Sequence, residues 1–526
     1  MTTVAQLFAS SRSVIHLDPA GSSAPNPGPP QLTVRADEIA AQAQPLADQL
    51  IADGLEPGDR VAVWAPNGLG YLLTLAACAT AGFVVVSVNT RYSATEAHEL
   101  IVRSGAKAVV TSPENVARLE ELESDSQWLK VPLPLATAPI GSLERLEAPT
   151  HTEAPTPTSP FVVFTTSGTT NKPKMVLHQH HSIYQHAHDV ARTFELDAES
   201  RIMLALPLCG VFGLATLTSA LAADASVWIP TAFDADAVAQ QIARHHIDVM
   251  HGADEMFHRM LTTGHDLSSI RLGGYARFNP SLSDIARRAD EVGITLTGLY
   301  GMSEVQALYL LQDPSGPIER REVGGGNLVS PQAEARIVNP DTGEPLPAGT
   351  DGEMELRGPS LFAGYLAEGG GAIDTALTDS AHRVDPNGTR WFASGDLGRL
   401  EEDGTISYLT RMGDVLRLGG FLVSPAEIES VLLEFDEIAD VQVVTVSLSE
   451  GVRPVAMVIP SQSNGQAAPI DETAVIAHCQ QRLARFKAPI RIVPVAEFPV
   501  TLSANGTKIQ RNKLQQMAQT IVDGAN

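Results

Sequence analysis

The chain has 526 residues, more than one compact domain usually holds, so we expect a large body and at least one smaller unit. Apolar residues make up 44% of the chain and charged residues 18%, as in ordinary globular enzymes, and no apolar run is long enough to indicate a membrane span. The formal net charge of −25 disfavours contact with a phosphate backbone, so we expect no nucleic acid partner.

The N-terminus favours a cytoplasmic protein, and the spacing of the cysteines favours structural roles for them. Residues 1–21 lack the charged start, apolar block and cleavage site of an export signal. Cys78, Cys209 and Cys479 lie far apart, without the close spacing of a zinc site or a disulfide framework. We therefore expect each cysteine to be a small buried hydrophobic residue.

Alternating apolar runs and helix-like stretches predict an α/β body. Between residues 60 and 112 the order is strand, helix, strand, helix, strand, which is typical of a mostly parallel sheet with helices on both faces. Residues 130–160 are rich in proline and have no hydrophobic period, so we expect a surface connection there. The α/β rhythm resumes between residues 201 and 301.

The chain changes character twice after this body. Beyond residue 325, short apolar runs alternate with glycine and proline turns, which predicts a β-rich subdomain. Past Gly413 the pattern predicts a small α+β unit, with helices within 425–435 and 472–485. We place the boundary there, which gives an N-terminal domain of residues 1–413 and a C-terminal domain of residues 414–526.

Residues 165–174 read TTSGTTNKPK and concentrate hydroxyl side chains, a glycine and two lysines at the end of the apolar run 161–164. Such a loop can wrap a phosphate, because successive backbone N–H groups form a positive concavity and glycine permits close approach. The spacing of a Walker loop is absent. Composition alone leaves a solvated Ser/Thr loop as an equal alternative.

Several further segments, read beside this loop, resemble those of the AMP-forming adenylating superfamily, which includes acyl-CoA synthetases, luciferases and the adenylation domains of peptide synthetases. Residues 81–100 are similar to an early segment of that family, and TTSGTTNKPK is similar to its phosphate loop. The resemblance covers nearly the whole chain. The remaining matches are YGMSE at 300–304, SGDLG at 394–398, RMGD at 411–414, LRLGGFLVSPAEIE at 416–429 and NGTKI at 505–509.

The resemblance implies ATP-dependent activation of a carboxylic acid to an acyl-adenylate, then thioester formation with coenzyme A. Glu304 would bind Mg²⁺, Ser303 would donate to the α-phosphate, and Lys508 would stabilise the adenylation transition state. The resemblance further implies a C-terminal domain that rotates about Asp414, after which Gly419 and Gly420 line a tunnel for the thiol. ATP would be held by Thr165, Thr166, Ser167, Gly168, Thr169, Thr170, Lys174, Tyr300 on adenine, Asp396 on ribose, and Arg411.

Three positions depart from the family pattern near these ligands. In the phosphate loop, Asn171 and Met175 stand where glycines are usual, and asparagine is the non-glycine residue that best tolerates positive φ. Arg417 stands where a lysine is frequent, so the charge is kept and the point-like geometry is not.

The most informative departure lies in residues 207–213. Where related ligases often carry an aromatic residue and a histidine beside the acyl group, this chain has Cys209 and Gly210. We expect an acid pocket that includes these two residues with Gly274 and Tyr275, reshaped for a branched, cyclic or bulky acid. The equal alternative is that neighbouring side chains refill the space. The candidates for refilling are Trp228, Met256 and Tyr275.

Histidines gather within 178–188 and 245–251, where spacing of two can indicate a metal. No cysteine or carboxylate set accompanies them, so structural roles are favoured, and His180 matches a structural histidine of the family. The expected partners are a small-molecule carboxylic acid, ATP and coenzyme A, with a homodimer as one arrangement. An enzyme that loads a carrier protein is the alternative activity, and a non-catalytic nucleotide-binding protein is disfavoured by the charged residues named above.

Overall fold

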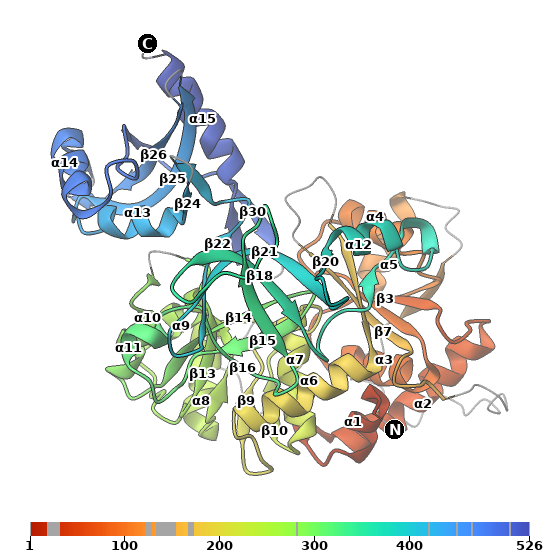
Figure 1. The fold of residues 1–526 in the computed structure, drawn as a ribbon. Coiled ribbons are helices and arrows are strands. Elements are labelled where there is room, and N and C mark those ends of the chain that lie inside the picture. The colour runs from red at the N-terminus through yellow and green to blue at the C-terminus, as the bar shows by residue number, and fades with distance from the viewer. Residues whose placement is uncertain are drawn as a thin grey trace.

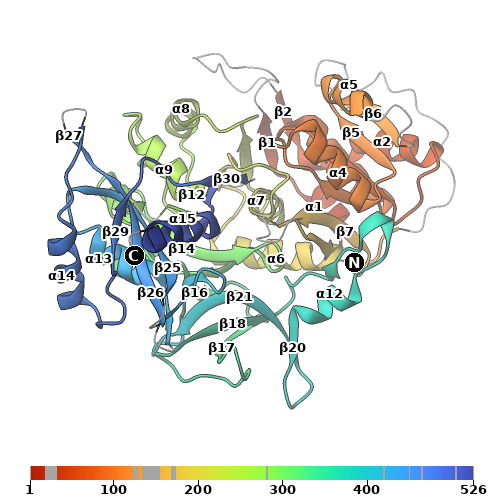
Figure 2. The same cartoon turned by 90° about the horizontal axis from the view of Figure 1, so that it is seen from above.

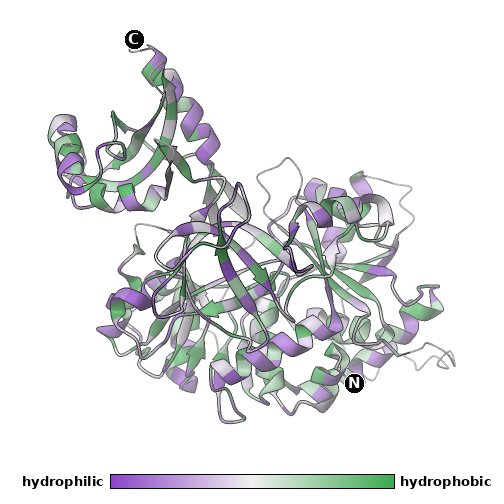
Figure 3. Cartoon of the chain, viewed as in Figure 1, coloured by the Kyte–Doolittle hydropathy of each residue, from purple (hydrophilic) through white to green (hydrophobic). Residues whose placement is uncertain are grey.

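The computed structural model in Figure 1 describes residues 2–17, 32–122, 128–132, 154–166, 173–279, 282–418, 421–448, 451–463, 466–503 and 506–524. Apolar residues concentrate on the strands inside a large body, and polar residues concentrate on its outer helices and loops (Figure 3). A smaller unit formed by the C-terminal residues lies at the upper left in Figure 1. The expected α/β body with a β-rich subdomain and a small α+β domain is confirmed.

Valine-rich runs form a seven-stranded sheet in the order β19-β8-β7-β4-β3-β5-β6. The pairs β4–β7, β3–β4, β3–β5 and β5–β6 are parallel, whereas β8 returns antiparallel to β7. The central strands are buried on both faces, which explains their continuous apolar sequence. The strands are β3 (Arg60–Trp64), β4 (Val84–Ser87), β5 (Ala108–Thr111), β6 (Leu129–Pro132), β7 (Pro160–Thr165), β8 (Met175–Gln179) and β19 (Gly364–Tyr365).

A five-stranded sheet, in the order β11-β9-β10-β1-β2, takes two strands from the N-terminus and three from the middle of the chain. Strand β1 pairs parallel with β10 and antiparallel with β2, so the N-terminal segment closes this edge of the body. The strands are β1 (Val14–Leu17), β2 (Leu32–Arg35), β9 (Arg201–Met203), β10 (Ser226–Ile229) and β11 (Val249–Met250).

The third sheet has ten strands and joins the α/β body to the β-rich subdomain. Strands β12, β13 and β14 are parallel, and the path continues antiparallel through β15, β16, β22, β21, β18 and β17, with β20 paired to β21. Figure 2 shows β17, β18 and β21 on the side opposite α8. The strands are β12 (Gly252–Ala253), β13 (Gly273–Ala276), β14 (Leu296–Met302), β15 (Gln306–Leu311), β16 (Gly325–Leu328), β17 (Glu334–Val338), β18 (Asp351–Arg357), β20 (His382–Val384), β21 (Arg390–Leu400) and β22 (Ile406–Arg411).

Helices separate and cover these sheets. Helices α3 and α7 are apolar on all sides and buried along almost their whole length, as expected of helices enclosed between layers. The helices of the body are α1 (Val4–Ser10), α2 (Ala36–Ala52), α3 (Leu69–Ala81), α4 (Ala94–Ser104), α5 (Pro113–Leu122), α6 (His180–Thr193), α7 (Val211–Ala222), α8 (Ala235–His245), α9 (Asp254–Leu261), α10 (Ile285–Asp290), α11 (Ile318–Arg321), α12 (Thr375–Ser380) and the short 3₁₀ helix Glu368–Gly370.

The C-terminal unit packs three helices around the antiparallel pair β25–β26, to which β29 adds in parallel. Its last hairpin, β30–β31, reaches from the unit toward the large body (Figure 1). The elements are β23 (Leu416–Leu418), β24 (Phe421–Val423), α13 (Pro425–Leu432), β25 (Ile438–Leu448), β26 (Gly451–Pro460), β27 (Gln462–Ser463), β28 (Gln466–Ala467), α14 (Glu472–Arg482), β29 (Ile492–Pro494), β30 (Val500–Ser503), β31 (Gly506–Ile509) and α15 (Arg511–Gly524).

One expectation needs correction. Residues 130–132 belong to strand β6, which pairs with β5, so the surface connection predicted for 130–160 begins later than expected. The later α/β stretch joins two different sheets, because β11 and β12 separate after Met250.

The three cysteines are buried and free, as expected. Among the residues that the structure describes, no helix is both long and apolar enough to cross a membrane.

Candidate functional site

The predicted nucleotide ligands Asp396, Arg411 and Tyr300 come together from three strands of the ten-stranded sheet, of which β21 and β22 are neighbours and β14 is not adjacent to either. Asp396 on β21 lies opposite Arg411 on β22, and the guanidinium Nη1 is 3.0 Å from the carboxylate Oδ1. The Tyr300 hydroxyl at the end of β14 donates to Asp396 Oδ2 at 2.6 Å. Asp396 is buried, whereas 44% of the Arg411 side chain is exposed, so the cation faces outward from an anchored carboxylate.

Tyr300 is also held by its ring. Its ring centroid lies 5.4 Å from that of Tyr408 with an interplanar angle of 32°. Burial raises the pKa of Tyr300, and the neighbouring Asp396 charge raises it further, so the phenol stays protonated and keeps its donor. The predicted adenine stacking stays a prediction.

The predicted magnesium ligand is a buried carboxylate within an aromatic and cationic setting. Glu304 is 4% exposed, and its Oε1 accepts the Tyr365 hydroxyl at 2.9 Å. Lys174 places its Nζ 4.6 Å from the centre of the Tyr365 ring. Burial raises the pKa of Glu304, while the Tyr365 hydrogen bond and the charges of Arg411 and Lys174 oppose that rise.

The phosphate-loop segment is a β-hairpin whose two ends are tied together. The Thr166 N–H donates to the Lys174 carbonyl at 3.0 Å, and the Lys174 N–H donates to Thr166 Oγ1 at 3.3 Å. Thr165 Oγ1 lies 3.5 Å from the Tyr92 hydroxyl. The predicted ligands Ser167, Gly168, Thr169 and Thr170, together with Asn171, lie outside the described residues.

A buried histidine fixes the segment that carries Ser303 and Glu304. His178 Nε2 donates to the Ser303 carbonyl at 2.7 Å, so its ring joins β8 of one sheet to the β14–β15 turn of another. Gly301 lies on β14 just before this turn and packs closely against β15, because a Cβ there would lie 2.7 Å from the Ala307 Cα. His178 and Tyr365 were not among the predicted site residues, since only the folded chain brings them beside Ser303 and Glu304.

The predicted acid-pocket residues separate into two groups. Cys209 and Gly210 precede α7, and Gly274 on β13 donates its N–H to His251 Nδ1 at 3.3 Å. Burial raises the pKa of Cys209 to about 11, so its thiol is not a nucleophile at neutral pH. Tyr275 is buried, and its hydroxyl donates to the Arg321 carbonyl at 3.4 Å.

The structure also gives contacts for two of the side chains that were candidates for refilling the space beside Cys209 and Gly210, namely Trp228 and Met256. Trp228 stacks on His16 with a centroid distance of 4.2 Å and lies 5.4 Å from His245. Met256 places its sulfur 3.4 Å from where a Cβ of Gly252 would be. A residue absent from the prediction, Phe212 on α7, stacks over His251 at 6.1 Å.

The C-terminal candidates are only partly described. Lys508 lies on β31, where its backbone pairs with Thr501 on β30, and nothing is described of its side chain. Gly419, Gly420 and the side chain of Arg417 lie outside the described part of the chain. Asp414 follows the end of β22 in the chain, and its N–H donates to the Arg411 carbonyl at 2.9 Å.

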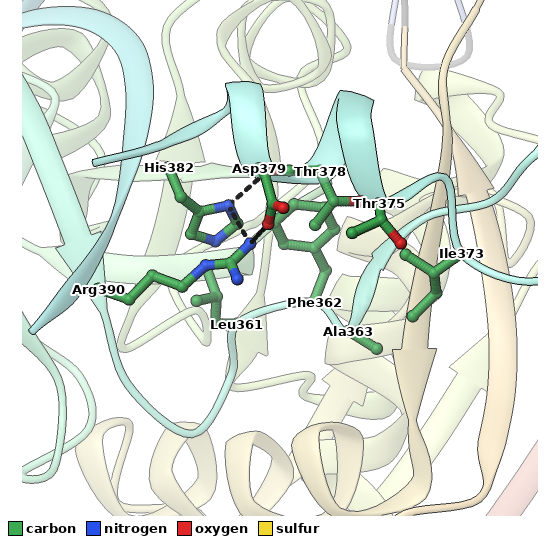
Figure 4. A pocket seen from close by; sticks show the side chains of 9 residues that line it. All are labelled: Leu361, Phe362, Ala363, Ile373, Thr375, Thr378, Asp379, His382 and Arg390. Carbon is green, nitrogen blue, oxygen red and sulfur yellow. Dashed lines mark hydrogen bonds and ion pairs between the residues drawn. The ribbon is translucent and has the colours of Figure 1, made fainter. Parts of the chain in front are cut away.

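A cavity of about 320 Å³ lies beside the segment that supports Glu304, on α12 and the strands around it (Figure 4). Phe362 lines this cavity, and its N–H donates to the Glu304 carbonyl at 2.8 Å. Arg390 points to Asp379 at 2.9 Å and to His382 Nδ1 at 3.2 Å across the opening (Figure 4). None of the predicted acid-pocket residues lines it.

The clustered histidines have structural partners. His180 Nδ1 accepts the Val4 N–H at 3.2 Å, and His186 Nε2 donates to the Ala307 carbonyl at 2.5 Å. Burial lowers the pKa of each to about 4, so both are neutral. In the part of the chain that the structure describes, no group of three or more His, Cys, Asp or Glu side chains could hold a metal.

Residues 33–366 match the AMP-binding enzyme family, and residues 427–505 match the AMP-binding enzyme C-terminal domain. The chain therefore belongs to the AMP-binding enzyme family. It is an AMP-forming carboxylic acid–CoA ligase, which uses ATP and Mg²⁺ to form an acyl-adenylate and then a coenzyme A thioester.

Similar proteins share this architecture over nearly their full length. A 3-[(3aS,4S,7aS)-7a-methyl-1,5-dioxo-octahydro-1H-inden-4-yl]propanoyl:CoA ligase of Mycobacterium tuberculosis is 30% identical over 89% of this chain and 91% of its own. A feruloyl-CoA synthase of an Amycolatopsis species is 28% identical over 88% of this chain and 90% of its own. The crystal structure of ATP-bound MatB from Rhodopseudomonas palustris matches 98% of this chain and 99% of its own, with a TM-score of 0.83 and 25% identity.

Proposed function

We propose that Glu304, Asp396 and Arg411 form the nucleotide end of the active site, and that Lys508 completes it from the C-terminal domain. The observation that carries this proposal is the Tyr300–Asp396–Arg411 arrangement, with a hydrogen bond of 2.6 Å and an ion-pair distance of 3.0 Å between residues of three strands. A carboxylate fixed by two partners can accept both ribose hydroxyls without reorganising. The outward guanidinium of Arg411 can donate to ribose or phosphate oxygens.

The residues around Glu304 fit a magnesium ion. Mg²⁺ prefers carboxylate oxygen, and Glu304 offers a buried carboxylate whose Oε1 is oriented by Tyr365. When bound, the ion would neutralise charge on the phosphate oxygens of ATP. Lys174 would add a second positive charge at the same end of the phosphate loop, and the Ser303 hydroxyl would donate to the α-phosphate.

The chemistry places two anions together, the attacking carboxylate and the triphosphate. Positioned cations therefore supply most of the rate enhancement, and Lys508 on the β30–β31 hairpin would be the one nearest the reacting oxygens. The C-terminal domain, with its boundary at Asp414, would then rotate so that Gly419 and Gly420 line the path of the thiol.

Separating the two half-reactions tests these roles. We expect Lys508→Ala to reduce acid-dependent pyrophosphate release about 10³-fold, while thioester formation from supplied acyl-adenylate changes less than about tenfold. Lys513→Ala, an exposed lysine on the adjoining helix α15, is the matched control and should leave both rates unchanged. Equal losses in the two half-reactions of Lys508→Ala would contradict the assignment.

The acid is proposed to be larger than a short fatty acid, because Cys209 and Gly210 are small where related ligases often carry large side chains. The similar ligases named above act, by their names, on a bicyclic propanoate and on ferulate. A panel of fatty, aryl and cyclic acids, followed by mass as CoA thioesters, tests this proposal. We also propose a cytoplasmic location and a homodimer, which cell fractionation and analytical ultracentrifugation would test.

A further inference from the structure

His251 lies where the chain crosses from one sheet of the large body to another. Strand β11 ends at Met250 in the five-stranded sheet, and β12 begins at Gly252 in the ten-stranded sheet. The residue between them is enclosed, with only 1% of its surface exposed. Strand pairing on both sides therefore fixes the backbone that presents this imidazole.

The imidazole contacts both segments proposed for the acid pocket. Its Nδ1 accepts the Gly274 N–H at 3.3 Å. Its ring stacks on Phe212, two residues after Gly210, with an interplanar angle of 20°. The Phe194 ring packs against another side of the imidazole in an edge-to-face arrangement, with a centroid distance of 4.4 Å. His251 is thus held between the two walls of the proposed pocket.

The Nε2–H group of the His251 ring has no hydrogen-bond acceptor among the described residues. Because Nδ1 accepts a hydrogen bond, a neutral imidazole carries its proton on Nε2. Burial lowers the pKa of His251 to about 3, so the ring is neutral at physiological pH. No group in the described part of the chain accepts from Nε2. An unpaired buried donor is destabilising, and an apolar side chain of similar shape would avoid that cost.

We propose that His251 is a specificity-determining residue whose Nε2–H donates to an oxygen on the hydrocarbon part of the acid, away from its carboxylate. The preferred substrate class is then a carboxylic acid with a carbonyl group on its chain or ring. This inference deepens the proposed function and rests on it, because the acid must bind between α7 and β13. The small residues Cys209 and Gly210 favour a bulky acid for the same pocket.

His180 is a second buried histidine with an Nε2 unpaired among the described residues, but it lies away from the proposed acid pocket. His180 Nε2 is also buried without an acceptor. Its Nδ1 accepts from Val4 in the N-terminal helix, and its ring packs 4.9 Å from Phe161 on β7. His180 therefore joins structural elements and has no described contact with Gly274 or Phe212, which makes it a matched control for the loss of a buried imidazole.

The test compares acids that differ only in one carbonyl group. Initial rates of CoA thioester formation by the full-length enzyme are measured with octanoate, with its 4-, 5-, 6- and 7-oxo derivatives, and with 3-cyclohexylpropanoate and its 4-oxo derivative. We expect at least one oxo acid to exceed its unsubstituted partner about tenfold in kcat/KM. We expect His251→Phe to abolish this preference, and His180→Phe to retain it.

Three results would overturn the proposal. The first is a wild-type enzyme that uses every oxo acid no better than its unsubstituted partner, a result that needs no variant to fold. The second is a His251→Phe enzyme that keeps the preference, which would place the acceptor elsewhere. The third is a His180→Phe enzyme that loses it. If no acid in any panel gives a thioester, the proposed function itself fails, which is a distinguishable outcome.

Discussion

Arg511→Ala should destabilise the C-terminal domain selectively, because Arg511 is the cationic partner of a buried carboxylate. Its Nη2 donates to Glu429 Oε1 at 3.0 Å, and its Nη1 donates to the Val443 carbonyl at 3.1 Å. Glu429 is 2% exposed at its side chain and also accepts the Val443 N–H at 2.9 Å. The three residues join α15, α13 and β25, so one substitution loosens three elements.

The magnitude follows from what the substitution leaves behind. Removing one partner of a buried ion pair costs about 3–5 kcal/mol, because the other charge stays buried. Burial already raises the pKa of Glu429, and Arg511 opposes that rise, so its loss raises the pKa further. A raised carboxyl pKa means that the folded state binds the proton more readily than the unfolded state, so the variant regains stability as the pH falls. We expect a loss of about 3 kcal/mol at pH 7.5 and a smaller loss at pH 5.5.

Native-state hydrogen exchange of the full-length chain measures this loss locally. A change of about 3 kcal/mol in the opening free energy corresponds to roughly 150-fold faster exchange of protected amides in β25 and α15. Glu429→Gln in the Arg511→Ala background should restore much of the protection, because it removes the uncompensated charge. Arg491→Ala breaks a more exposed pair with Glu472, at 2.9 Å, and should cost less than about 1 kcal/mol.

The reasoning would be refuted if exchange in β25 and α15 of Arg511→Ala stayed within about threefold of the wild type. It would also be refuted if the double variant exchanged as fast as Arg511→Ala alone. The second result would mean that lost packing of the arginine stem, rather than the buried charge, sets the stability.

Three further substitutions probe the body of the enzyme. Tyr365→Phe removes a hydrogen bond to the Glu304 carboxylate and should lower kcat/KM for pyrophosphate release about tenfold in a coupled phosphate assay. Gly301→Ala would place a Cβ against the backbone of β15 and should lower the thermal midpoint and abolish activity, as scanning calorimetry and the same assay would show. Asp396→Asn should raise the Kd for ATP at least tenfold by isothermal titration, since the ribose acceptor loses its charge.

Each of these has a control within the chain. Tyr309→Phe removes a buried hydroxyl that donates to backbone carbonyls only, so it should not change pyrophosphate release as Tyr365→Phe does. Gly524→Ala adds a Cβ that meets nothing within 4 Å. Asp403→Asn removes an exposed carboxylate paired with Arg320 at 3.3 Å and should leave ATP affinity unchanged. If a control matches its partner substitution, the role assigned to that partner is wrong.

Local pattern was enough to predict most of the elements. The valine runs that became β3, β4 and β5 are buried on both faces, so their apolar sequence stands out without any tertiary information. The division between β11 and β12 could not be found this way. It depends on which strand each half pairs with, and residues 249–253 read as one short uninterrupted stretch, VMHGA, in the sequence.

The candidate site likewise contains residues that sequence motifs identify and residues that only the folded structure reveals. The pairing of Asp396 with Arg411 is a cross-strand contact between two recognisable motifs, so the residues were identified before their geometry was known. Tyr365 and His178 belong to no recognisable motif. Tyr365 contacts Glu304, more than sixty positions away in the chain, and His178 contacts Ser303, more than one hundred positions away. His251 was noticed only as one of several histidines, because its ring contacts come from Phe194, just after α6, and Phe212 on α7.

The turn after β22 leaves no spare length between the proposed nucleotide site and the proposed domain boundary. Arg411 pairs with Asp396 through its side chain and accepts the Asp414 N–H through its carbonyl, while the Met412 N–H donates to the Gly395 carbonyl at 2.8 Å. A one-residue insertion or deletion here could not be absorbed by the loop. It would misplace the guanidinium and re-aim every residue that follows, so the spacing between these positions is as much a part of the enzyme as their chemistry.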